Sequence, residues 1–234
     1  MLDSLYLLLM LPALGLSLWA SFRTKSAFKK YSRVAAMRGI SGAQAARTML
    51  ERAGIHDVEV VPTKGYLSDH YNPTNKRLAL SEAVHDARSI AALGVACHEA
   101  GHAIQHAKGY KPLWLRSLLV PTANIGSRLG YFVMLGGLIL LYMGSTFGVQ
   151  VVVFGALLFS AVLLFQIVTL PVEFDATARA KRLAVEYGIV AAQEREGMDK
   201  VLNAAALTYV AAAVSTLMTL LYFLIRSGVL GGRR

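Results

Sequence analysis

The residues best suited to chemistry form the pentapeptide His98-Glu99-Ala100-Gly101-His102. Positions i and i+4 share one face of a helix, so both imidazoles can reach a single ion. Histidines at this spacing are typical of zinc peptidases, in which the intervening glutamate acts as general base on a zinc-activated water. We therefore expect one Zn²⁺ per chain, held by His98 and His102, with Glu99 as the catalytic base. The alternative is a helix that merely buries two histidines beside an unrelated glutamate.

A third protein ligand is required. His106 lies eight residues after His98, roughly 12 Å along a helix axis, which is too far for ligands of one ion. Glu173 is the first charged residue after the uncharged run 129–172, and it is the better candidate. It could also be an acid that simply ends a membrane helix. Asp175 lies about 200° further round a helix, so we expect it either to hold an imidazole N–H without touching the ion or simply to be solvated.

The composition indicates a membrane protein. Hydrophobic residues make up 55% of the chain and charged residues 16%, whereas soluble domains carry roughly 25% charged residues. Uncharged runs predict about four transmembrane helices, since one span needs about 20 residues. They are an N-terminal anchor over 1–22, a helical hairpin over 129–172 and a helix over 204–226, followed by the tail 227–234. Asp3 and Trp19 favour a retained anchor over a cleaved signal peptide.

Two polar segments remain, residues 23–128 and 173–203. In the first, we expect a helix over 43–53 with Ser41 as its N-cap, and a helix over 86–107 that carries the histidine motif. Short apolar runs predict strands over 58–61 and 77–81.

The basic residues suggest an orientation. Several lie just after the first span, and cytoplasmic loops are enriched in Lys and Arg. We therefore expect the N-terminus outside and both polar segments in the cytoplasm, although Arg226 then lies outside, against the rule. An even number of spans separates His102 from Glu173, so the site should lie at the cytoplasmic membrane surface. The net charge of +10 follows this distribution and does not indicate nucleic-acid binding. A single cysteine, Cys97, excludes an intrachain disulfide.

Four segments together resemble the YugP-type bacterial membrane zinc metallopeptidases and, more distantly, the HtpX-type membrane proteases, which are gluzincins. The segments are Leu67–Pro73, Arg88–His106, Pro171–Ala176 and Leu202–Ala211. The resemblance implies a small zincin-like α+β catalytic domain in a multi-pass α-helical protein of the bacterial cytoplasmic membrane. It also implies that Glu173 is the third ligand. Where HtpX-type proteins have an aspartate four residues after that glutamate, this chain has Thr177.

The zincin fold implies an edge strand that holds an extended substrate through its main chain. Its candidate here is Arg77, Leu78, Ala79 and Leu80, although this could be an ordinary sheet strand. Candidates for stabilising the oxyanion are His70, Tyr71 and Tyr209, each of which could instead be structural.

The function that these observations favour is a zinc-dependent endopeptidase acting on peptides or proteins, membrane proteins included. An intramembrane protease is disfavoured because the uncharged run before His98, residues 89–97, is too short to span. A non-catalytic zinc-binding scaffold, or a partner subunit of a membrane quality-control complex, would not need Glu99. A transporter would need more ionisable residues in its spans. A complex partner or a homo-oligomer is compatible with the sequence.

Overall fold

The computed structural model describes residues 3–231, which fall into two compact units. One, here called the helical unit, comprises Met1–Trp19, Leu115–Leu170 and Tyr209–Arg234. The other, here called the mixed unit, comprises Ala20–Trp114 and Pro171–Thr208.

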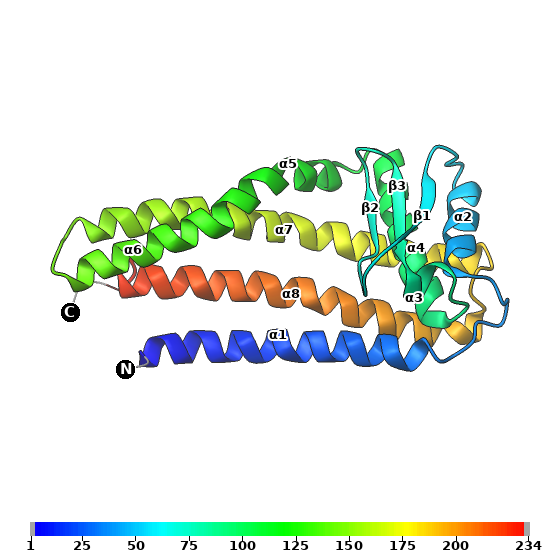
Figure 1. Ribbon diagram of the computed structural model, residues 1–234, viewed down its shortest axis with the longest axis horizontal. Coiled ribbons are helices and arrows are strands. Elements are labelled where there is room, and N and C mark those ends of the chain that lie inside the picture. Colours follow the sequence, from blue (N-terminus) through cyan, green and yellow to red (C-terminus); the bar gives the residue numbers. More distant parts are fainter. Residues whose placement is uncertain (1–2, 232–234) are drawn as a thin grey trace. The chain divides into compact units, whose positions relative to one another are not determined.

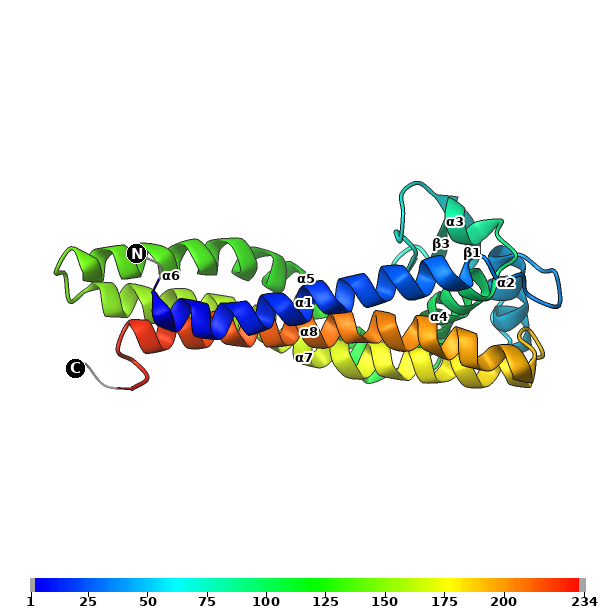
Figure 2. The ribbon, with the colours of Figure 1, turned by 90° about the horizontal axis from the view of Figure 1, so that it is seen from below.

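Within residues 3–231, four helices are long and apolar enough to cross a membrane. They are α1 (Ser4–Tyr31), the continuous helix Lys111–Tyr142, α7 (Gly148–Glu186) and a last helix that contains α8 (Arg195–Arg226). The expectation of about four spans agrees with this number. In the helical unit many large apolar side chains are exposed, which suits a hydrocarbon environment. Figures 1 and 2 both show α1 beside α8, where the hydroxyls of Ser17 and Ser215 are 3.0 Å apart.

The predicted hairpin corresponds to α6 (Tyr131–Tyr142) and the first part of α7, joined at Gly144. The helix that leads in begins at Lys111, well before the uncharged run, and contains α5 (Lys111–Ile125) and the π-helical segment Gly126–Gly130. Glycines allow α6 and α7 to pack closely, because a Cβ at Gly137 or Gly155 would lie 2.6 Å from backbone nitrogen of the other helix.

The mixed unit contains a three-stranded sheet of order β1-β3-β2. β1 (Glu59–Thr63) pairs in parallel with β3 (Arg77–Ser81), and β2 (His70–Asn72) pairs antiparallel with β3 on its other side. The strand over 77–81 is therefore confirmed, but β3 is central in the sheet, so the expectation that Arg77, Leu78, Ala79 and Leu80 form an edge strand is wrong. The register of β2 ends at Ala79, so substrate binding by the main chain of Leu80 stays a prediction.

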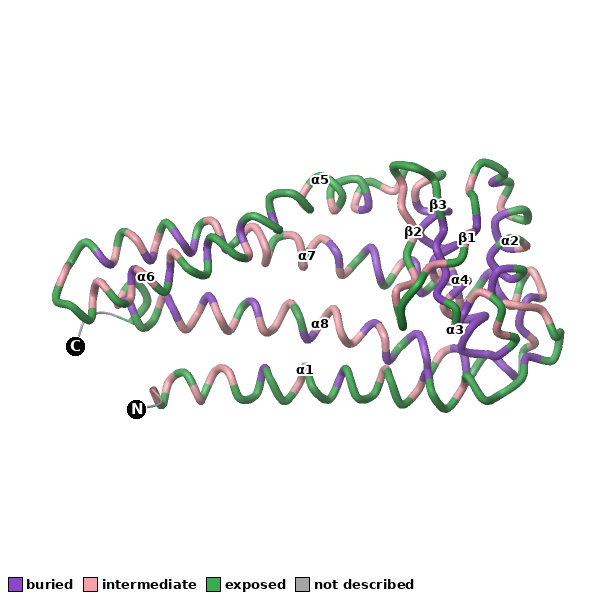
Figure 3. The backbone as a smooth tube through the Cα atoms, in the orientation of Figure 1, coloured by how far each residue is buried: buried purple, intermediate pink, exposed green. Residues whose placement is uncertain are grey.

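Helices α2 (Gly42–Arg52) and α4 (Ile90–Ala107) pack with the sheet around one core. Figure 3 shows α4 as almost entirely buried. The predicted first helix is confirmed, since Ser41 caps α2 and accepts from Gln44 N–H. The second helix begins later than expected: the short α3 (Glu82–His85) comes first, and Ser89 caps α4. Burial of α4 places its side chains in an environment from which water is largely excluded.

Candidate metal centre

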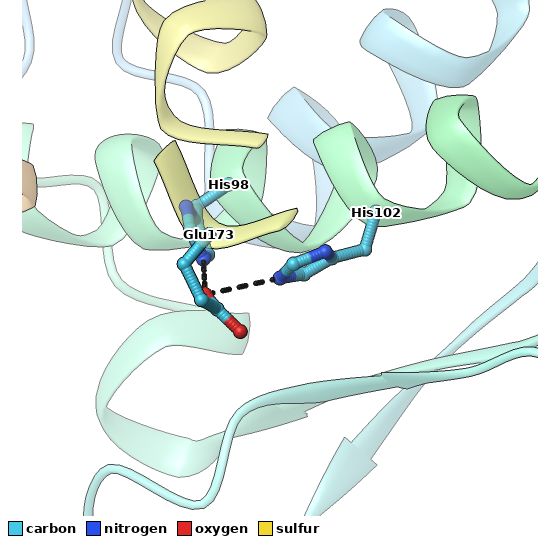
Figure 4. A group of neighbouring side chains, drawn as sticks. All are labelled: His98, His102 and Glu173. Atoms are coloured by element: carbon cyan, nitrogen blue, oxygen red, sulfur yellow. Dashed lines mark hydrogen bonds and ion pairs between the residues drawn. The ribbon is translucent and has the colours of Figure 1, made fainter. Parts of the chain in front are cut away.

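Two helices of the mixed unit bring together the three predicted ligands. His98 and His102 project from adjacent turns of α4, and Glu173 projects from α7. The Nε2 atoms of His98 and His102 lie 3.2 Å and 3.4 Å, respectively, from the same Glu173 oxygen, Oε2. One ligand atom from each residue lies within 4.8 Å of the others. Figure 4 shows the side chains of His98 and His102 pointing toward the Glu173 carboxylate. Glu173 follows His98 by 75 residues and His102 by 71 residues. The convergence of the three side chains therefore depends on how α4 and α7 pack.

A glycine within the motif permits that packing. A Cβ placed on Gly101 would lie 2.8 Å from the carbonyl oxygen of Ala176, closer than real Cβ atoms approach backbone. The α7 backbone therefore lies directly against α4, one turn after Glu173. Gly101 thus sets the distance between the helix of the histidines and the helix of the glutamate.

Each imidazole has a partner at its second nitrogen. His98 Nδ1 lies 3.2 Å from the hydroxyl oxygen of Thr177, and His102 Nδ1 lies 2.9 Å from Oε1 of Gln105. If both rings carry their proton on Nδ1, these atoms donate to Thr177 and Gln105, and both Nε2 lone pairs face the space beside Glu173. Two imidazole nitrogens and one carboxylate form a ligand set found in catalytic zinc sites, with a fourth position left open. The residues present therefore fit zinc.

Asp175 does not contact an imidazole itself. Its Oδ2 accepts from Nε2 of Gln105 at 2.8 Å, and its two oxygens accept from the Arg179 guanidinium at 2.6 Å and 3.3 Å. The position of Asp175, two residues after Glu173, turns it away from the rings, so its connection to His102 runs through the Gln105 amide. Sequence reasoning missed Gln105, and it named Thr177 only as the residue at the position where HtpX-type proteins have an aspartate. Only its spacing of three residues from His102 on a helix could have suggested Gln105.

Glu99 is 8% exposed and lies on α4 beside His98. Burial alone would lower the pKa of His102, but the hydrogen bond to Glu173 and the nearby charge of Glu99 raise it above its ordinary value. The carboxylate of Glu99 therefore interacts electrostatically with His102.

The remaining candidates are His70, Tyr71 and Tyr209, of which the first two contact other groups. His70 is exposed, and its Nδ1 lies 2.9 Å from the carbonyl oxygen of Ser68. The Tyr71 hydroxyl lies 2.8 Å from Nδ1 of His106, and burial raises the pKa of Tyr71 to about 12. This contact joins β2 to the last turn of α4. Tyr209 lies on α8 in the helical unit.

Comparison with known proteins covers nearly the whole chain. Residues 6–228 match the family described as "Putative neutral zinc metallopeptidase". The "Putative membrane protease YugP" of Bacillus subtilis (strain 168) is 48% identical over 219 residues, which are 94% of this chain and 95% of that protein. No solved structure matches. The matched residues include every member of the centre described above.

Proposed function

The chain belongs to this zinc metallopeptidase family, as its resemblance to YugP-type proteins predicts, and on that premise we propose that it is a membrane-embedded zinc endopeptidase. In this proposal His98, His102 and Glu173 bind one Zn²⁺, and Glu99 is the general base. The observation that carries it is the convergence of both Nε2 atoms on one Glu173 oxygen. A scaffold could share that convergence, but it would have no need of a buried carboxylate beside the ligands.

The metal supplies Lewis acidity when bound, which makes water a usable nucleophile near neutral pH and polarises a carbonyl. Glu173 contributes the negative charge of the ligand set, and the two imidazoles contribute neutral donors. Glu99 accepts a proton from the attacking water as the oxygen of that water adds to the scissile carbonyl carbon. It then delivers that proton to the amine nitrogen as the carbon–nitrogen bond breaks. The products are a carboxylic acid and an amine.

The membrane part of the proposal is supported by the four long apolar helices and by the B. subtilis relative, whose name describes a membrane protease. Glu173 lies on the same helix, α7, as the end of the uncharged run. This continuity supports a site at a membrane surface, and the basic residues after the first span support the cytoplasmic side. We infer that the substrates are peptides or proteins, membrane proteins included, and that the bilayer belongs to the bacterial cytoplasmic membrane.

The test is Glu99→Gln in the full chain, purified in detergent. Glutamine is nearly isosteric and cannot accept the water's proton, so casein hydrolysis should fall by about 10²–10⁴-fold. The zinc content should stay at one per chain, because neither histidine nor Glu173 is changed. Exposed Gln193→Leu is the control and should hydrolyse casein at the wild-type rate. Equal hydrolysis by wild type and Glu99→Gln would remove Glu99 as base, and a zinc-loaded wild type without hydrolysis would favour the scaffold.

A further inference from the structure

Gln105 uses its whole side-chain amide inside the protein. It has no exposed surface, and it lies three residues after His102 on α4. Its Oε1 is 2.9 Å from His102 Nδ1, while its Nε2 donates to the carbonyl oxygen of Val172 and to Oδ2 of Asp175, both at 2.8 Å. Val172 immediately precedes Glu173. One amide thus connects His102 with the turn of α7 that carries Glu173.

The amide can lie in only one orientation. If it were turned over, its Oε1 would face the Val172 carbonyl and the Asp175 carboxylate, and all three groups are acceptors. Asp175 is itself held by two hydrogen bonds from Arg179. The two acceptors on α7 therefore require Nε2 on their side, which leaves Oε1 toward His102. Because Oε1 can only accept, His102 must carry its proton on Nδ1.

We propose that Gln105 is a positioning residue that fixes the tautomer of His102, so that the Nε2 lone pair faces the metal, and fastens that ring to the Glu173 turn. This inference rests on the metal site of the proposed function. The arrangement around His98 differs, because the Thr177 hydroxyl can rotate to donate or to accept. The tautomer of His102 is thus dictated by α7, whereas that of His98 is not dictated by Thr177.

Two variants distinguish the role of the Gln105 acceptor oxygen, Oε1, from the role of its donor group, Nε2. Gln105→Leu has a similar volume and removes all three hydrogen bonds. Gln105→Glu keeps an acceptor toward His102, loses both donors and places a second carboxylate near Asp175. The exposed Gln193→Leu is the matched control. The readouts are zinc affinity of the full chain in detergent by chelator competition, the visible spectrum after Co²⁺ loading, and the unfolding temperature of the chelator-treated protein.

Gln105→Leu should bind zinc about 10–100-fold more weakly than wild type, the usual cost of losing a partner of a metal-bound histidine. Its Co²⁺ spectrum should shift, because the His102 ring is no longer held. Gln105→Glu should bind more tightly than Gln105→Leu, and Gln193→Leu should match wild type. Wild-type affinity and spectrum in Gln105→Leu would overturn the proposal, and so would equal weakening in the Leu and Glu variants, which would indicate packing alone.

If the chelator-treated Gln105→Leu protein is unfolded, the Gln105→Glu variant tests the acceptor role instead. A wild-type-like Co²⁺ spectrum in that variant supports the acceptor role, and a spectrum unlike the wild type contradicts it. None of these readouts needs a substrate. A wild-type protein that binds zinc but does not hydrolyse casein would therefore refute the peptidase and leave the role of Gln105 standing.

Discussion

The two carboxylates of α7 near the metal centre differ in what they contact. Glu173 is 1% exposed and lies against both imidazoles, whereas Asp175 is partly exposed and reaches His102 only through Gln105. We therefore expect Glu173→Ala to lose zinc on dialysis, because two imidazoles alone are a poor ligand set. Asp175→Ala, the matched control, should keep its zinc with at most a modest loss of affinity. Metal analysis checks both, and one zinc per chain in Glu173→Ala would exclude it as a ligand.

The sequence alone led to these three predicted ligands because each has a signal along the chain. The histidines have their helical spacing, and Glu173 is the first charge after a long uncharged run. Gln105 has no comparable signal, since its contact with His102 depends on side-chain rotamers. Thr177 was singled out only by its position four residues after Glu173, and its contact with His98 depends on the packing of α4 against α7. Asp175 was expected either to hold an imidazole N–H or simply to be solvated, and only the structure shows the Gln105 amide between it and His102.

At the scale of elements, the contact between α4 and α7 places a strict limit on residue size. A Cβ at Gly101 would meet the Ala176 backbone at 2.8 Å, so Gly101→Ala must push the helices apart. Such overpacking costs about 1–3 kcal/mol, and the displacement would carry Glu173 away from the histidines. We expect a lower unfolding temperature and weaker zinc binding. At Gly94, on the same helix, the nearest atom is a flexible Met198 side chain at 3.2 Å.

Gly94→Ala is therefore the control for Gly101→Ala, and it should bind zinc as wild type does. Thermal unfolding in detergent and chelator competition measure the two effects. If Gly101→Ala and Gly94→Ala have the same zinc affinity, the close approach at Gly101 does not set the geometry of the centre.

The elements of the mixed unit show what periodicity can and cannot predict. The strand over 77–81 and the helix after Ser41 follow from local apolar patterns and a capping residue, and the structure has both. The place of that strand in the sheet does not follow, because its second neighbour, β2, has only three residues and no readable alternation. Strand order depends on contacts distant in sequence, so a central strand was taken for an edge strand.

At the scale of the whole molecule, long uncharged runs predict four apolar helices because hydrocarbon thickness sets their length. The part of the chain that the structure describes has four such helices. The start of the second could not be predicted from charge, since that helix begins at Lys111 and includes Arg116 and Arg128. Which side each polar segment faces depends on the membrane and the insertion machinery, so orientation rests on the distribution of basic residues.

That orientation can be tested with single cysteines in intact cells. The native Cys97 is fully buried, and burial raises the pKa of its thiol to about 12, so it has almost no reactive thiolate at pH 7–8. The Cys97→Ser substitution, made in every variant, removes any residual labelling of this thiol. Lys64→Cys lies in the exposed segment between β1 and β2, and Val229→Cys lies in the exposed segment after α8.

If the mixed unit is cytoplasmic, a membrane-impermeant maleimide should label Val229→Cys in intact cells and should label Lys64→Cys only after permeabilisation. The two positions lie on opposite sides under this orientation because α8 crosses the membrane between the second polar segment and its own C-terminal end. Each variant is therefore the control for the accessibility of the other. Rapid labelling of Lys64→Cys in intact cells, with Val229→Cys protected, would show that the protein is inserted the other way and that its metal centre faces outward.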